Sequence, residues 1–439
     1  MGDYVPVTKE EQQEMLKTCG LEKTSDLYRD IPDEARLKKT LDLPEGKSEL
    51  EVRRVLGGLA ARNHIFPTIF RGAGAYRHYI PAIVDQVTDQ EESLRTAYTP
   101  YQAEISQGVL QAIFEYQTDI CELTGMDASN ACVYDGATAA AEGCAMCRDR
   151  RRTKILAAAT VDPKVLSVVK TYSLGSGAQV EVIPEKDGVL DQDALIKALT
   201  PDVACLLLQS PDYYGNIEEV RAIADAVHAA KAKIVLSMNP IAMAVLETPG
   251  EAGVDVAVGE GQPLGLPLGF GGPYVGFMAT TAKMMRHLPG RIVGETTDVD
   301  GKRGYVLTLQ AREQHIRREK ASSNICSNEA FCALKISAYL AAMGPEGLRE
   351  AAVQCSSKAH YLQGVLAEAG VKPVYDKPFF HEFVTDCPDA GKLLRALEEK
   401  DILGGLPLSD RRILWCATEM NTKDEMDLTA SVAKEVFGS

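Results

Sequence analysis

The side chains best suited to ligand chemistry lie in one short polar segment, residues 98–104. Tyrosine hydroxyls and a glutamine amide can hydrogen-bond to ligand oxygens, and an aromatic ring can form the wall of a pocket. The segment also has the order of a helix start, with a threonine cap, a proline next and a glutamine three residues after the cap. The residues alone favour the helix start. The candidates are Tyr98, Thr99, Tyr101, Gln102 and Glu104.

A second polar segment, Ser322-Ser323-Asn324, precedes a long helix-like stretch. Its hydroxyls and backbone N–H groups could hold an anionic group. Asn324 or Ser327 could equally cap the helix that follows. The residues leave both interpretations open.

A glycine-rich run, GLPLGFGGP at residues 265–273, follows a predicted strand. Glycines let a backbone approach another backbone or an anion closely, so a structural turn and a ligand loop are both consistent with it. Other motifs fail. Cys144 and Cys147 have no second pair at zinc spacing, so we expect buried thiols and no metal site.

These segments must be positioned by an α/β core. Short β-rich runs alternate with helix-like stretches between residues 130 and 280, which indicates a mainly parallel sheet flanked by helices. Ligands in such sheets bind at the carboxyl ends of the strands. The predicted strands are 154–158, 179–183, 203–208, 233–237, 254–258 and 274–279, and the predicted helices are 162–174, 191–199 and 217–231.

Flanking regions have a different texture. Residues 99–125 predict a helix whose buried face carries Ile105, Val109, Ile113, Tyr116 and Ile120, and which ends at Gly125. Two helix-like stretches, 328–343 and 346–369, lead into strand-like runs at 371–375, 379–385 and 413–417, with helices near 389–400 and from 423. This order predicts a small α+β domain.

Composition excludes several classes of protein. The 439 residues are 45% hydrophobic and 25% charged, close to the globular average, so disorder, collagen and coiled coil are excluded as the main architecture. Lysine and arginine number 47 against 62 acidic residues, a net charge of −15. Such an acidic surface repels nucleic-acid phosphates and anionic membranes, so we expect neither as a partner.

No apolar stretch approaches the ~20 residues that a membrane span needs. The N-terminus is polar and does not resemble a secretory signal. The 11 cysteines, an odd number, suit reduced thiols. We therefore expect a cytoplasmic protein.

Taken together, the motifs resemble the glycine cleavage system P-protein family over almost the whole chain. The length is similar to that of the N-terminal chain in those members of the family that consist of two chains. The resemblance implies the fold type I architecture of pyridoxal-phosphate (PLP) enzymes, with an N-terminal helical arm (1–60), a large aspartate-aminotransferase-like α/β domain with a seven-stranded type of sheet (61–330) and a small C-terminal α+β domain (331–439). The matching segments are YVPVT (4–8), GAGAYRHYIP (72–81), TAYTPYQAEISQG (96–108), YDGATA (134–139), the glycine-rich run and KASSNIC (320–326).

This resemblance makes one absence informative. A PLP enzyme of this fold needs a lysine just before the glycine-rich run to hold the cofactor, and this chain has Gln262 and Pro263 there. No lysine occurs between Lys233 and Lys283, and the strand expected to supply a carboxylate for the pyridinium nitrogen ends at Asn239. We expect no covalent PLP in this chain, unless Lys231, Lys233 or Lys283 serves instead.

The resemblance therefore implies that this chain contributes residues to the active site of a partner chain, subunit 2. Subunit 2 would carry the lysine and PLP in a probable α2β2 assembly. Together the chains would decarboxylate glycine and pass the aminomethyl group to the lipoyl arm of H-protein. In this interpretation Tyr98, Thr99, Tyr101, Gln102 and Glu104 border the partner's pocket, and Ser322, Ser323 and Asn324 reach its phosphate side.

Two rivals stay open at this point. The chain could be a catalytically uninvolved scaffold or regulator of subunit 2. It could also be a self-sufficient homodimeric enzyme of another PLP class, which the lysine-free span disfavours.

Overall fold

The computed structural model of the chain describes residues 7–39, 41–90, 99–321, 323, 325 and 329–438. The chain divides into two compact units, residues 1–65 and 66–439, and each is described by itself. Among the described helices, none combines the length and apolarity that crossing a membrane requires. The predicted three-part division at residues 60 and 330 stays a prediction.

The first unit is helical, as expected for residues 1–60. It contains α1 (Lys9–Thr18), a 3-10 helix (Thr24–Tyr28) and α2 (Glu49–Ala60). Capping boxes start both α-helices, Thr8 with Glu11 and Ser48 with Glu51, and these satisfy backbone N–H groups that a helix start leaves open.

Seven strands form the large sheet of the second unit, in the order β2-β10-β9-β8-β7-β3-β4. The strands β4, β3, β7, β8 and β9 run parallel, and β10 is antiparallel to both its neighbours. The mainly parallel sheet and its six predicted strands are thus confirmed. Their bounds are β2 Ala128–Ser129, β3 Lys154–Ala158, β4 Val180–Ile183, β7 Val203–Ser210, β8 Lys233–Met238, β9 Val256–Glu260 and β10 Gly276–Thr280.

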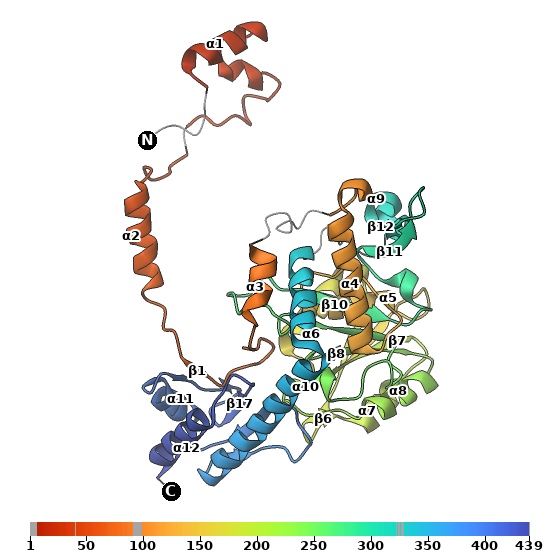
Figure 1. The fold of residues 1–439 in the computed structure, drawn as a ribbon, viewed down its shortest axis with the longest axis vertical. Coiled ribbons are helices and arrows are strands. Elements are labelled where there is room, and N and C mark those ends of the chain that lie inside the picture. Colours follow the sequence, from red (N-terminus) through yellow and green to blue (C-terminus); the bar gives the residue numbers. More distant parts are fainter. Residues whose placement is uncertain are drawn as a thin grey trace. The chain divides into compact units, whose positions relative to one another are not determined.

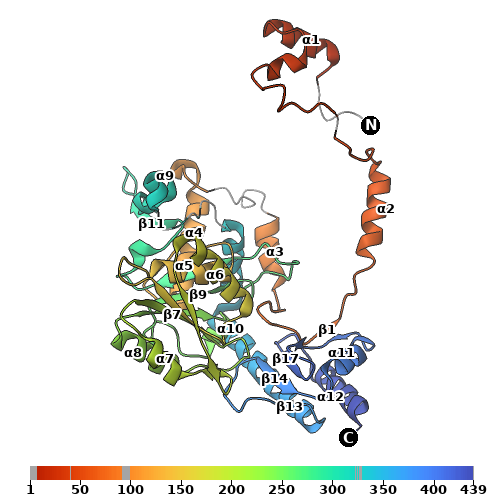
Figure 2. The same cartoon turned by 180° about the vertical axis from the view of Figure 1, so that it is seen from behind.

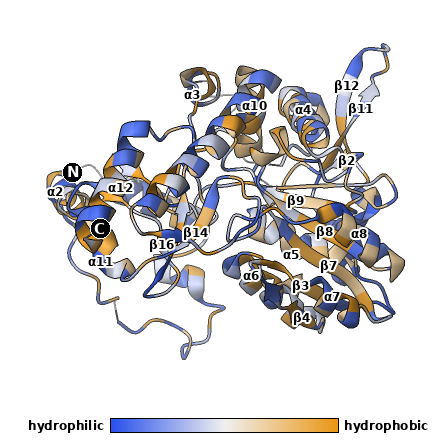
Figure 3. Ribbon diagram, turned by 90° about the horizontal axis from the view of Figure 1, so that it is seen from below, coloured by the Kyte–Doolittle hydropathy of each residue, from blue (hydrophilic) through white to orange (hydrophobic). Residues whose placement is uncertain are grey.

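The central strands are buried because their side chains are apolar on both faces, which is the pattern of parallel strands covered by helices. Figure 3 shows β7 and β8 coloured as hydrophobic along most of their length. The helices of this part are α3 Ala82–Asp89, α4 Gln107–Thr124, α5 Gly136–Met146, α6 Pro163–Ser176, α7 Gln192–Ala198 and α8 Val220–Ala229.

The predicted start of the α4 helix is wrong. The helix begins at Gln107 after a 3-10 turn at Ala103–Ile105, not at Thr99. A tertiary contact overrides the local cap signal, because the Gln107 amide bonds the backbone of Tyr305 through both its atoms. Ile105, predicted on the buried face, is therefore 78% exposed, whereas Ile113 is buried. The predicted end at Gly125 is confirmed, with φ +65°.

A hairpin and a short helix follow the large sheet. Strands β11 (Ile292–Thr297) and β12 (Arg303–Thr308) pair in antiparallel fashion. The helix α9 (Gln314–Arg317) lies a few residues later and is bordered by 3-10 turns at Gln310–Arg312 and Arg318–Lys320. The Gln107 side chain of α4 bonds the backbone of Tyr305 in β12, and this contact ties the hairpin to α4.

The long helix α10 (Ala330–Glu368) links the two cores of the second unit. Gly344, with φ +61° and ψ 178°, interrupts it just before Pro345, where the sequence predicted two stretches. Figure 1 shows its first half beside α4 and its second half beside α12 (Lys423–Phe437). The packing of this helix against both cores joins them.

The small C-terminal part is α+β, as predicted. Its sheet has the order β13-β14-β17-β16, and Figure 2 shows β13, β14 and β17 gathered near α12. The core contains the chain's one tryptophan, Trp415. The remaining elements are β13 Lys372–Pro373, β14 Glu382–Asp386, α11 Ala390–Glu398, β15 Ile402–Leu403, β16 Leu406–Pro407, β17 Arg412–Cys416, β1 Thr68–Ile69, β5 Glu185–Lys186 and β6 Val189–Leu190.

Candidate functional site

A cavity of about 390 Å³ lies at the carboxyl ends of the parallel strands, where sheets of this kind bind ligands. Asp162, Gln209, Asn239 and Glu260 follow or end β3, β7, β8 and β9 and line it. The small part supplies Glu382 from β14, together with its neighbour His381. The cavity is thus built by both cores.

The position expected for a cofactor lysine, Gln262-Pro263, borders this cavity. Pro263 lines it, and the buried Gln262 side chain is fully engaged with backbone. The Gln262 carbonyl oxygen accepts from Tyr76 N–H (3.1 Å), and its amide donates to the oxygens of Tyr76 (2.9 Å) and Leu266 (2.8 Å). This glutamine holds two loops together where a cofactor enzyme presents an amine.

Asn239 also lies where the sequence placed it, at the end of β8. Its Oδ1 accepts from the N–H groups of Ile241 (2.9 Å) and Ala242 (3.3 Å). The side chain caps a turn and carries no charge. It therefore cannot stabilise a protonated pyridinium ring in the way that a carboxylate does.

The N-terminus of α5 faces the same cavity, and a helix N-terminus is the usual seat of a phosphate. Here two carboxylates already occupy its N–H groups. Glu260 accepts from Gly136 N–H (2.9 Å), and Asp135 accepts from Thr138 N–H (2.7 Å). A phosphate at this position would have to compete with Glu260 and Asp135 for these N–H groups.

These residues do not fit PLP. The lysine, the pyridinium partner and an anion-accepting helix end are each replaced by groups with other hydrogen-bond partners. Lys164 is the one lysine among the described residues that line the cavity, and its Nζ donates to Ala73 O at 3.4 Å. The other lysines considered in place of a cofactor lysine lie elsewhere: Lys231 and Lys233 at the amino end of β8, and Lys283 after β10. None of these three lysines is among the described residues that line the cavity.

Buried acids dominate the cavity's electrostatics. Burial raises the pKa of Glu260 to about 7, although the N–H groups of Gly136, Gln262 and Val275 oppose the shift. Burial likewise raises the pKa of Glu382 to about 7, against hydrogen bonds from Ala73 N–H and the Tyr76 hydroxyl. Near pH 7 an anionic cofactor would therefore lie against two carboxyls that are each partly ionised. The position of Glu260 at a strand end could have been noticed in the sequence, but nothing there signalled Glu382.

Of the predicted segment 98–104, the described residues 99–104 lie at a different place, beside the β11–β12 hairpin. Tyr98 falls outside the described residues. Thr99 is buried, whereas Gln102 and Glu104 are exposed. The Tyr101 hydroxyl accepts a hydrogen bond from Arg291 Nη2 (2.6 Å), and the Tyr101 ring lies 5.2 Å from the Arg291 guanidinium carbon. Arg291 in turn pairs with Glu313 (2.5 Å). No sequence pattern predicted this Arg291–Glu313 pair.

The second predicted segment approaches the same corner. Ser322 and Asn324 lie outside the described residues. The Ser323 hydroxyl donates to the carboxylate of Glu142 (2.8 Å), whose pKa burial raises to about 7. Two residues later, Ile325 lies against Gly290: a Cβ added to Gly290 would come within 3.7 Å of its side chain. Because Gly290 precedes Arg291, Ile325 and Tyr101 lie against neighbouring residues of one turn.

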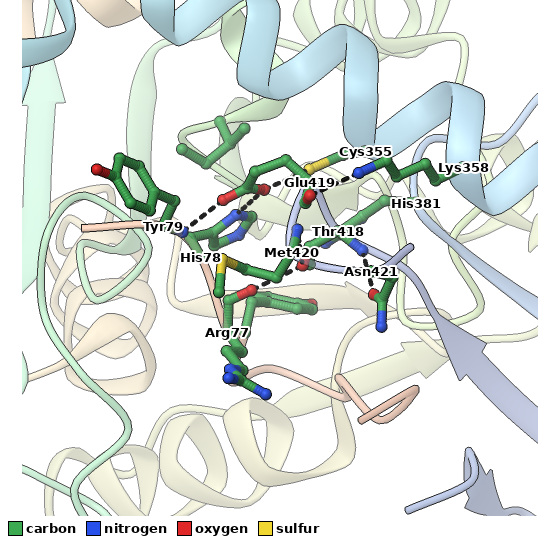
Figure 4. A network of polar contacts seen from close by, with 12 residues as sticks. Arg77, His78, Tyr79, Cys355, Lys358, His381, Thr418, Glu419, Met420 and Asn421 are labelled. Atoms are coloured by element: carbon green, nitrogen blue, oxygen red, sulfur yellow. Dashed lines mark hydrogen bonds and ion pairs between the residues drawn. The ribbon is translucent and has the colours of Figure 1, made fainter. Parts of the chain in front are cut away.

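A third polar cluster lies between the cores, shown in Figure 4. Ligand atoms of His78, Cys355 and Glu419 all lie within 4.8 Å of one another, a spacing that a metal ion could use. However, Glu419 Oε2 already lies 2.9 Å from His78 Nδ1 and accepts from Cys355 Sγ (3.2 Å). Tyr79 N–H and Lys358 bond the same residue. The arrangement is that of a hydrogen-bonded clamp.

Comparison with known proteins decides the family. The family model of the glycine cleavage system P-protein matches residues 2–432. A protein of Moorella thermoacetica named probable glycine dehydrogenase (decarboxylating) subunit 1 is 49% identical, over 99% of each chain.

The chain belongs to the glycine cleavage system P-protein family.

Solved structures agree with this membership. A crystal structure of glycine decarboxylase (P-protein) of the glycine cleavage system, in inhibitor-bound form, is 42% identical with a TM-score of 0.92, covering 99% of this chain and 100% of that one. An aspartate aminotransferase from Thermus thermophilus is 16% identical with a TM-score of 0.58, over 84% of this chain and 98% of that one. The second likeness confirms the predicted fold type I architecture alone. The P-protein family and fold predictions are both confirmed.

Proposed function

We propose that this P-protein chain is the subunit of a two-chain glycine decarboxylase that completes the active site without holding the cofactor. The observation that carries the proposal is the threefold replacement in its own cavity. Gln262, Asn239 and Glu260 occupy the positions that a PLP enzyme needs for its lysine, its pyridinium partner and its phosphate, and each is engaged with backbone.

The partner is a second P-protein chain, which holds PLP on its own lysine. The subunit-1 name of the relative from M. thermoacetica supports the existence of such a partner. Glycine loses its carboxylate at the shared site, and the aminomethyl group passes to the lipoyl arm of H-protein. We propose an α2β2 assembly. In this proposal two groups of residues border the partner's pocket. The first group is Tyr98, Thr99, Tyr101, Gln102 and Glu104, and the second, on the phosphate side, is Ser322, Ser323 and Asn324.

A cytoplasmic location suits this role. The ten described cysteines are free thiols, and most of them are buried. Free thiols persist in a reducing compartment.

Separate and joint expression of the two chains tests the proposal. Each purified preparation is assayed for bound PLP and for exchange of glycine carboxylate with bicarbonate in the presence of lipoylated H-protein. We expect exchange only when both chains are present. Exchange by this chain alone would contradict the proposal and revive the self-sufficient enzyme, and full exchange by the partner alone would leave this chain as a scaffold.

A further inference from the structure

An exposed tyrosine in this chain is held by a buried ion pair. Tyr101 is 49% exposed, yet Arg291 engages both its hydroxyl (2.6 Å) and its ring (5.2 Å from the guanidinium carbon to the centroid). A half-exposed tyrosine ordinarily samples several rotamers. A charge-assisted hydrogen bond combined with a cation–π contact restricts this one to a single orientation.

Arg291 is itself immobilised. Its side chain is 4% exposed, and it pairs with Glu313, which is 3% exposed, at 2.5 Å. The Arg291 carbonyl accepts from Ala131 N–H (2.8 Å). Arg312 braces the preceding turn by donating to the carbonyls of Leu288 and Gly290. The guanidinium that contacts Tyr101 therefore has a fixed position.

Burying such a pair is costly, and stability alone is a weak reason to keep it, because apolar side chains of similar size often serve as well. The pair ends on the hydroxyl of a half-exposed tyrosine, and it thereby holds that side chain in one orientation. Donation from a guanidinium also polarises a hydroxyl and strengthens the hydrogen bond that its proton makes.

We propose that Arg291, fixed by Glu313, is a positioning residue that orients Tyr101 toward the partner subunit's active site. This inference rests on the proposed function, since it assumes that Tyr101 borders the shared pocket. Arg291 acts only through the tyrosine.

A double-mutant cycle in the two-chain enzyme tests this coupling. Arg291→Lys keeps the charge near Glu313 but loses the planar fork that spans both partners, and Tyr101→Phe keeps the ring but loses the hydroxyl. We expect each single variant to lower kcat/KM for exchange about tenfold, the size expected for one charge-assisted hydrogen bond. The double variant should be no slower than Tyr101→Phe. Losses that multiply would overturn the proposal.

Arg303 offers a matched control on the same hairpin. Its guanidinium lies 6.0 Å from the Tyr305 ring, so Arg303→Lys alters a similar contact and should leave kcat/KM unchanged. If Arg291→Lys fails to assemble, Glu313→Gln takes its place in the cycle with the same expectation.

The outcomes separate this inference from the proposed function. Unchanged exchange in Tyr101→Phe, with both chains still required, overturns the positioning role and leaves the proposed function standing. Full exchange by the partner alone removes both.

Discussion

At the scale of single residues, three positions in the cavity of this P-protein chain lack the side chains that a PLP enzyme uses to hold its cofactor. Glu260 places a carboxylate on the N-terminus of α5, Gln262 ties two loops together, and Asn239 caps a turn. Each side chain has a structural task of its own. Restoring one catalytic group therefore leaves the other two obstacles in place.

A lysine returned to the cavity should not restore cofactor binding. We expect that Pro263→Lys, incubated alone with PLP and passed through gel filtration, retains no visible cofactor absorbance. The reason is that Glu260 still occupies the Gly136 N–H at the start of α5 and Asn239 still offers no charge. The partner chain serves as the positive control. Retained absorbance that borohydride abolishes would show that the missing lysine was the sole defect.

The residues of this cavity were predictable to the extent that strand ends could be located. Gln262, Pro263 and Asn239 follow strands whose apolar runs stand out in the sequence, so their places are as expected. Glu382 could not be found in this way, because it comes from the small C-terminal part. Outside the cavity, Arg291 could not be found either, because its position beside Tyr101 depends on a pairing with Glu313 that no local pattern encodes.

At the scale of elements, tertiary contacts decide where helices begin and how the cores join. Gln107 moves the start of α4 by bonding Tyr305, and Gly344 interrupts α10. The clamp of His78, Cys355 and Glu419 connects the segment before α3, the second half of α10 and the loop after β17 (Figure 4). Its members are far apart in sequence, which is why the sequence did not predict it.

Removing the clamp's charge should destabilise the protein. Glu419 is partly buried, with a side chain 13% exposed. We expect Glu419→Gln to lower the free energy of unfolding by about 2–4 kcal/mol, because an amide NH2 group would face donors that now bond a carboxylate. Urea unfolding measures the effect. The exposed Glu399→Gln is the control, expected within about 0.5 kcal/mol of wild type. If both substitutions lowered the free energy of unfolding equally, the clamp would not be the source of the stability.

The same residue predicts a pH dependence. Burial alone would raise the pKa of Glu419, but hydrogen bonds from His78, Tyr79 and Cys355 hold it at about 2, below the ordinary 4.5. A depressed pKa stabilises the fold fully above about pH 4.5 and loses that contribution as the pH falls toward about 2. The stability difference between wild type and Glu419→Gln should therefore shrink on acidification. A difference that grows would contradict this sign.

At the scale of the whole molecule, residues 66–439 form one compact unit with two principal cores that share α10. Ala352 and Cys355 of this helix belong to the large core, and Ala359 and Leu362 to the small one. The residue pattern of the sequence changes near residue 330, but this pattern did not predict that one helix would pack against both cores. Periodicity identifies an apolar face without saying which core it meets.

This sharing predicts cooperative unfolding. The fully buried Trp415, the one tryptophan of the chain, donates to Thr385 Oγ1 (2.8 Å) and reports on the small core. We expect its fluorescence and the far-UV circular dichroism of the whole chain to give the same urea midpoint. A lower midpoint for the fluorescence would show that the small core unfolds independently.

The cofactor content of the assembled two-chain enzyme tests the central claim most directly. Purified enzyme saturated with PLP and freed of excess cofactor is titrated for bound PLP against the concentration of each chain. One PLP for each pair of chains, located on the partner, is the result that we predict, because Gln262 and Pro263 stand in this chain where a PLP enzyme has its lysine. Two for each pair would mean that this chain holds a cofactor of its own and would contradict the account.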